Sequence, residues 1–75
     1  MTKLPRLTAA RLLPALRKDG WYVVAQEGSH LQLRHPTKLG KVSVAEHTGK
    51  IIPPHILVSI LRQAGLTPDE LRRLL

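Results

Sequence analysis

The chain has 75 residues and carries 12 Lys or Arg against five Asp or Glu, which gives a formal net charge of +7. We expect a single domain over residues 1–75, because so short a chain buries only about 60% of its unfolded surface and has no room for a second core. There is no cysteine, which excludes disulfides and thiolate metal sites. The positive charge favours a polyanionic partner, whether RNA, DNA or an acidic protein.

Targeting signals are not expected. Residues 1–6 are not followed by the apolar segment of a signal peptide, and no uncharged apolar run has the length of a membrane span. We therefore expect a cytoplasmic location.

A first helix is expected over residues 9–18, with Thr8 as its N-cap and Gly20 just beyond its C-terminus. Three leucines in this segment recur at helical spacing. Pro14 does not fit, because it removes an interior hydrogen bond and presses on the carbonyl of Ala10. It predicts a kink or a later start of the helix.

Three strands follow. Residues 21–26 are rich in aromatic and β-branched side chains, and residues 30–34 and 41–45 alternate apolar with polar side chains. The connections are a turn at residues 27–29 and a loop at residues 35–40. Connections this short favour an antiparallel meander.

After a loop at residues 47–50, a second helix is expected over about residues 54–64, ended by Gly65. Its apolar stripe consists of Ile56, Leu57, Ile60 and Leu61.

A short last helix begins at a capping box, with Thr67 as N-cap, Pro68 in the first turn and Glu70 at the third position. Leu71, Leu74 and Leu75 are expected to dock it on the core. The element order predicts an α+β fold, in which helices cover one face of a three-stranded antiparallel sheet and a short C-terminal helix follows.

Strand alternation predicts what the uncovered face of the sheet carries. Leu31, Leu33, Val42 and Val44 should point toward the helices. The side chains expected on the other face, called here the open face, are His30, Gln32, Arg34, Lys41, Ser43 and Ala45. Such a mixture of imidazole, amide, hydroxyl and cationic groups suits a phosphodiester backbone.

His30 is the sharpest candidate for chemistry. An imidazole moves protons near neutral pH, and RNA brings its own nucleophile in the 2′-hydroxyl, so one positioned histidine with cations nearby can support strand scission without a metal. Gly28 would permit a positive φ or a close approach by substrate. The residues alone leave open a plainer interpretation, in which Gly28-Ser29 is only a hairpin turn and His30 a solvated strand residue.

The other histidines are weaker candidates for a functional role. His35 precedes a proline in a loop and His55 lies in a helical first turn, which favours structural or solvated roles for both, whereas His47 could contact phosphate beside Lys50. A zinc site is not expected, because His30 and His35 fall on opposite faces and no carboxylate cluster completes a ligand set. A nucleophilic role for Ser29 is disfavoured, since neighbouring strand residues point apart.

An ordered set of short motifs closely resembles the HicA toxin family. The resemblance runs from Leu12 to the last helix, and two features depart from the family pattern: Pro14 inside the first helix and the additional capped helix after Gly65-Leu66. The residues that carry it are Gly20-Trp21, Gly28-Ser29-His30, His35-Pro36, Val42-Ser43-Val44, His47-Thr48-Gly49-Lys50 and the run from Ser59 to Leu66.

The resemblance implies a fold like that of double-stranded-RNA-binding domains and the activity of an mRNA interferase that cleaves single-stranded or structured RNA and arrests translation. It implies that His30 is catalytic and that a cognate HicB-type antitoxin covers the site. We expect no cofactor, and we expect the free chain to be a monomer. We expect Lys41 and Arg34 to stabilise charge on the phosphorane and Lys50 to position the strand. The expected RNA contacts are Gly28, Ser29, Gln32, Arg34, Lys41, Ser43, His47 and Lys50.

Two alternatives stay open at this point. One is a non-catalytic RNA-binding module of the same fold, and the other is a protein whose positive face binds an acidic partner. Cleavage by the purified chain without added metal would separate them from an endoribonuclease.

Overall fold

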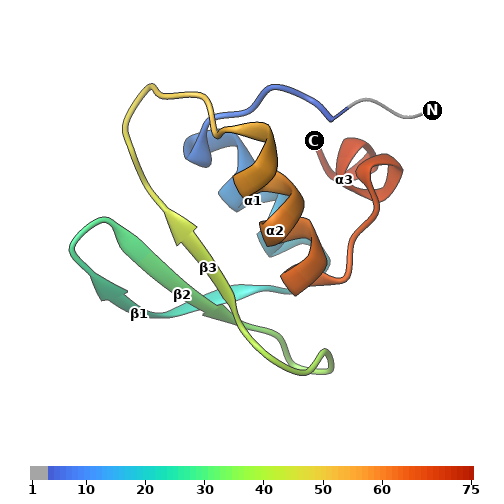
Figure 1. Ribbon diagram of the computed structural model, residues 1–75. Helices are drawn as coiled ribbons and strands as arrows, with labels where there is room; N and C mark the ends of the chain where they lie inside the picture. The colour runs from blue at the N-terminus through green and yellow to red at the C-terminus, as the bar shows by residue number, and fades with distance from the viewer. Residues whose placement is uncertain (1–3) are drawn as a thin grey trace.

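The computed structural model describes residues 4–75. Residues 1–3, which belong to the segment where no signal peptide is expected, lie outside the described part. Figure 1 shows a three-stranded sheet with α1 and α2 on one side, while α3 packs against α1 at the end away from the sheet. This confirms the predicted α+β fold. The elements are α1 (Ala9–Asp19), β1 (Tyr22–Glu27), β2 (His30–Arg34), β3 (Val42–Ala45), α2 (Pro54–Ala64) and α3 (Pro68–Leu74).

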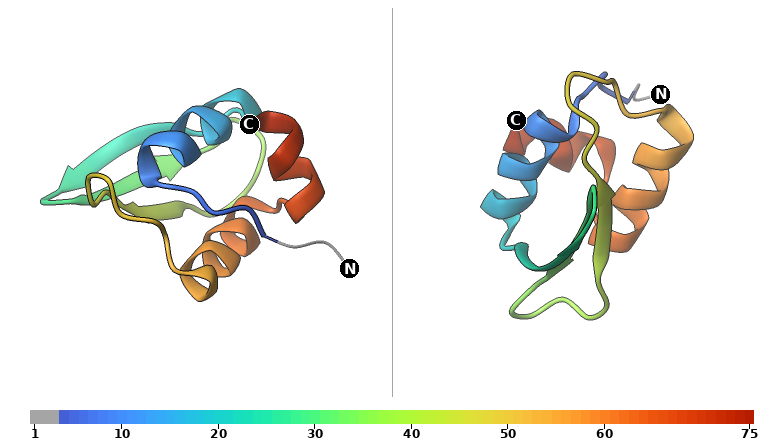
Figure 2. Two further views of the ribbon diagram at one scale, coloured as in Figure 1. Left: turned by 90° about the horizontal axis from the view of Figure 1, so that it is seen from above. Right: turned by 90° about the vertical axis from the view of Figure 1, so that its left-hand side faces the viewer.

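The sheet is an antiparallel meander in the order β1-β2-β3. Alternation along β2 and β3 sorts their side chains as predicted: Leu31, Leu33, Val42 and Val44 are buried against the helices, and the residues between them are exposed or half-buried. The two further views show the strands gathered at one end of the molecule and α3 at the other (Figure 2). The sheet therefore has the uncovered face that was predicted, and the strand register identifies the residues on it.

β1 behaves differently from the other strands. All six of its residues are exposed, and its register with β2 shifts at Val24, between Val23 and Ala25. The predicted strand also starts one residue too early, because Trp21 is buried in the core just before β1. A bulge of this kind bends an edge strand. The bend is consistent with the exposure of β1, which the helices do not cover.

α1 starts at Ala9, so the later start suggested by Pro14 is wrong. Pro14 lies within the helix on its exposed side, and the carbonyl of Ala10 that it leaves without an N–H partner belongs to an exposed residue that water can reach. Thr8 occupies the N-cap position without a side-chain cap hydrogen bond. Gly20 ends the helix at a φ of 111°, as expected for a residue free of a Cβ.

The predicted capping box at α3 is confirmed. The Thr67 N–H donates to Glu70 Oε1 at 3.0 Å, and the Glu70 N–H donates to Thr67 Oγ1 at 3.1 Å. Of the three leucines expected to dock this helix, Leu71 is buried, Leu74 packs partly against the core and Leu75 is exposed.

This box predicts a pH dependence of stability. Hydrogen bonds from Thr67, the backbone N–H first and the side chain second, lower the pKa of Glu70 below its ordinary value of 4.5. Because the folded-state pKa is depressed, the stabilisation is present above the unfolded-state pKa and is lost as the pH falls through the folded-state pKa. Thermal unfolding at a series of pH values should show wild type losing stability relative to Glu70→Gln only in that acidic range. Parallel profiles for the two proteins would contradict this.

Candidate nucleic-acid interface

The hairpin between β1 and β2 presents His30. Glu27 ends β1 and His30 begins β2, so the turn contains only Gly28 and Ser29, and the prediction of a three-residue turn is wrong by one residue. Gly28 has a φ of 57°, in the left-handed region that a tight hairpin requires. His30 is exposed, and its Cα partner on β3 is Ala45. The hairpin thus holds an accessible imidazole at one end of the open face.

Further along β2, Gln32 lies opposite Ser43 of β3. Ser43 Oγ donates to Gln32 Oε1 at 3.3 Å, so the amide nitrogen of Gln32 remains available as a donor. The Ser43 N–H on the outer edge of β3 donates to Oε1 of Gln63 on α2 at 3.0 Å. Gln32 and Ser43 therefore form a polar pair on the open face, as strand alternation predicted, and they lie on the same face as His30.

The two cations expected at the phosphorane lie at the other end of the strand. Arg34 follows His30 by four residues, about 13 Å along an extended chain. Its Nη1 donates to the carbonyl oxygen of Gly40 at 3.1 Å, which turns the guanidinium toward the 35–40 loop. Lys41 is exposed and lies just before β3 at that same end, so the predicted third strand started one residue too early. The structure therefore separates these two cations from His30 along the strand, and their contact with RNA stays a prediction.

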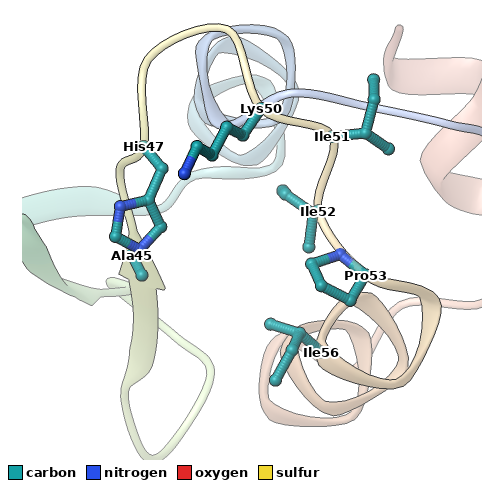
Figure 3. A pocket seen from close by; sticks show the side chains of 7 residues that line it. All are labelled: Ala45, His47, Lys50, Ile51, Ile52, Pro53 and Ile56. Carbon is teal, nitrogen blue, oxygen red and sulfur yellow. The ribbon is translucent and has the colours of Figure 1, made fainter.

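His47 and Lys50 lie at the His30 end instead. The Glu46 N–H donates to the Ser29 carbonyl at 2.7 Å, which ties the loop after β3 to the hairpin turn. The Lys50 N–H donates to the His47 carbonyl at 3.1 Å and closes a turn, in which Gly49 has a φ of 73°. Figure 3 shows the Lys50 side chain directed toward the His47 ring across the mouth of a hollow. The register and these hydrogen bonds thus place His47 and Lys50 at the end of the open face where His30 lies.

Glu27 is a residue that the sequence analysis missed. It is the Cα partner of His30, so both side chains stand on the same face, where opposed Cβ atoms lie about 4.5–5.5 Å apart. Assigning Glu27 to the turn removed it from the sheet. A two-residue turn at Gly28-Ser29 was the signal that pairs residues 27 and 30.

Two of the sequence motifs, Gly20-Trp21 and His35-Pro36, have structural roles. His35 Nδ1 accepts hydrogen bonds from the backbone N–H groups of Thr37 at 3.1 Å and Lys38 at 3.0 Å, so its proton sits on Nε2, which donates to the Asp19 carbonyl at 2.6 Å. The ring also packs edge-on against Trp21, with a centroid separation of 5.1 Å. His35 therefore fastens the 35–40 loop to the end of α1, as the structural interpretation predicted.

Lys38 completes this arrangement, which we call the His35 cluster (Asp19, Trp21, His35 and Lys38). Lys38 Nζ lies 2.6 Å from Asp19 Oδ2 and 2.9 Å from the Ala64 carbonyl at the end of α2. The indole Nε1 of Trp21 donates to the same Asp19 oxygen at 3.2 Å. One carboxylate and one ammonium thus join both helix ends to the loop, next to the negative ends of the helix dipoles.

A metal centre gains no support from the remaining groups. His55 is exposed in the first turn of α2, away from His30 in the sequence and the sheet. Among residues 4–75, His, Asp and Glu side chains nowhere gather in a group of three that could hold an ion. Each helix in the described part of the chain is too short or too polar to span a bilayer.

Comparison with known proteins gives one family. The model of the HicA toxin of bacterial toxin–antitoxin systems matches residues 9–66, which is more than half of the chain. A comparison with curated proteins gave no match. The matched region contains the hairpin, the open face, the 46–53 loop and the His35 cluster. The chain therefore belongs to the HicA toxin family and is the toxin component of a bacterial type II toxin–antitoxin system, with a cognate antitoxin as its partner.

Proposed function

We propose that the chain is an endoribonuclease that cleaves mRNA in the cytoplasm and so inhibits translation, with His30 as its catalytic residue. The observation that carries the proposal is the position of His30: an exposed imidazole at the end of an open sheet face, in a member of a toxin family. The open face also carries Gln32 and Ser43, and the 46–53 loop adds His47 and Lys50 at the His30 end, which are groups that contact phosphodiesters.

The chemistry needs one proton carrier. Neutral His30 takes the proton of the ribose 2′-hydroxyl while the 2′-oxygen bonds to the adjacent phosphorus. The bond from phosphorus to the 5′-oxygen then breaks, and the imidazolium returns the proton to that oxygen. The products are a 2′,3′-cyclic phosphate and a free 5′-hydroxyl, and His30 is neutral again.

Residues at the His30 end of the sheet support this cycle. Glu27, opposite His30 in the sheet register, stabilises the transient imidazolium by its charge. Lys50 and His47 lie at the same end and offset the charge that develops on the phosphoryl oxygens. The RNA strand is positioned by hydrogen bonds to Gln32, Ser43 and the backbone at Gly28-Ser29.

Arg34 and Lys41 contact phosphates farther along the RNA in this proposal. Arg34→Gln or Lys41→Gln should therefore weaken RNA binding without changing the chemical step. Each lost phosphate contact should make the dependence of log affinity on log salt shallower by about 0.7 for single-stranded RNA. Binding titrations at several salt concentrations measure that slope, and an unchanged slope in both variants would remove these residues from the interface.

Expression in cells tests the function itself. Induced wild type should arrest growth and fragment mRNA, whereas His30→Ala at the same protein level should do neither. Equal growth arrest by both proteins with intact mRNA would favour the alternative, a non-catalytic RNA-binding module of the same fold.

A further inference from the structure

A hollow of about 240 Å³ opens beside the hairpin end of the open face. Figure 3 shows it between the end of β3, the 46–53 loop and the first turn of α2. Ile52, Pro53 and Ile56 form an apolar wall opposite Ala45, with His47 and Lys50 at the rim.

Backbone hydrogen bonds hold this hollow open. The Ile52 N–H donates to the Leu7 carbonyl at 2.7 Å, and Ile51 bridges to Thr8, which ties this wall to the segment before α1. The Ile56 N–H donates to the Pro53 carbonyl at 3.0 Å and fixes the first turn of α2. The shape therefore belongs to the fold and does not depend on a ligand.

Pro53 and Ile56 make the apolar wall accessible, while Ile52 behind them is buried. Ile56 was expected on the buried stripe of α2, yet 41% of it is exposed, because it faces the hollow and not the core. Apolar side chains around a preformed concave surface are typical of ligand sites. The volume falls below the range of about 300–1,000 Å³ that holds drug-sized ligands, so the hollow suits one small flat group.

The position of the hollow identifies that group. Ala45, on one wall, is the Cα partner of His30, so the hollow begins one strand away from His30 at the same end of the sheet. A nucleotide combines a flat apolar face with an anionic phosphate, and the hollow combines an apolar wall with a His ring and an ammonium at its rim. Proteins that recognise single-stranded RNA bind its splayed bases on such surfaces.

We propose that this hollow binds one unstacked nucleobase of the RNA substrate, next to the phosphate that His30 attacks. The inference rests on the proposed function and adds a subsite to it. The base packs between the apolar wall and the His47 ring, and Lys50 contacts its phosphate.

The test begins with wild type and a short single-stranded RNA, in which the cleavage position is mapped. Copies of that RNA are then made with one flanking nucleotide at a time replaced by an abasic residue. Their binding is measured by fluorescence titration in a His30→Ala background, where the RNA stays intact, with and without Ile56→Ser. Leu39→Ser is the matched control, because Leu39 is 94% exposed and lies outside the hollow.

Ile56→Ser should weaken binding of the complete RNA about tenfold, the size of one lost base contact, while Leu39→Ser should not. One abasic position should cause a similar loss of affinity when Ile56 is present and almost none in the Ile56→Ser protein. An Ile56→Leu protein should still bind the complete RNA more tightly than the abasic RNA. Independent, additive losses or unchanged affinity would overturn the subsite. Loss of antitoxin binding alone in Ile56→Ser would also overturn it, because it would assign the hollow to the antitoxin.

The two proposals fail separately. If wild type leaves RNA uncleaved, the endoribonuclease proposal fails whatever the titrations show. If wild type cleaves RNA, and Ile56→Ser binds and cleaves as wild type does, only the nucleobase subsite falls.

Discussion

His30→Ala is expected to lower the rate of RNA cleavage about 10²–10⁴-fold, the usual contribution of a positioned proton-transfer group. The side chain is exposed and forms no hydrogen bond or ion pair in the described part of the chain, so its removal should leave thermal stability unchanged. Single-turnover cleavage of a labelled RNA by the purified proteins gives the rate. Thermal unfolding of the same preparations checks the fold.

His55→Ala is the matched control for this prediction. His55 is also an exposed histidine, but it lies in the first turn of α2 and not on the open face. It should retain the wild-type rate. A His30→Ala protein that cleaves as fast as His55→Ala would remove His30 from the mechanism.

Gly20→Ala should destabilise the fold by about 2–3 kcal/mol, from backbone strain at a left-handed residue together with a lost hydrogen bond. The φ of Gly20 is 111°, and a Cβ at this position would lie 2.6 Å from Nε2 of His35. The ring would have to move, which breaks its 2.6 Å hydrogen bond to the Asp19 carbonyl. A loss of this size should lower the midpoint of thermal unfolding by about 10 °C or more in a domain of this length.

Gly40→Ala separates the two causes. Gly40 also has a positive φ, 82°, but nothing lies within 4 Å of a Cβ built there. It should carry the backbone cost alone, about 1–2 kcal/mol. Equal destabilisation by the two substitutions would show that the contact between Gly20 and His35 contributes nothing.

The element order was predictable from the sequence because local signals agreed with the global fold. β2 alternates strictly, and that alternation alone placed His30 and Gln32 on the open face and Leu31 and Leu33 in the core. The capping box at Thr67 and the glycine after α2 likewise marked helix ends through contacts within a few residues.

Features that depend on contacts between distant segments could not be predicted in this way. The exposure of Ile56 follows from a hollow formed with the 46–53 loop, which helical periodicity does not encode. The hydrogen bond from Arg34 to Gly40 depends on the shape of the connection between β2 and β3, residues 35–41. Alternation gave Arg34 the correct face, but not its distance from His30.

The His35 cluster shows why conspicuous motifs need a structure to interpret. Gly20-Trp21 and His35-Pro36 stand out in the sequence as strongly as Gly28-Ser29-His30. The structure directs the first two inward, to a shared set of hydrogen bonds, and only the third outward. Of the two histidines in these motifs, His35 is half-buried and hydrogen-bonded, whereas His30 is exposed.

Cleavage by the purified wild-type chain, in the presence of a metal chelator, tests the proposed catalysis most directly. A labelled single-stranded RNA is incubated with the protein, and the new ends are identified by their reactivity. We expect fragments with 2′,3′-cyclic phosphate and 5′-hydroxyl ends, formed by wild type and absent with His30→Ala. RNA that wild type binds but leaves intact, or ends with a 5′-phosphate, would contradict catalysis by the 2′-hydroxyl and His30.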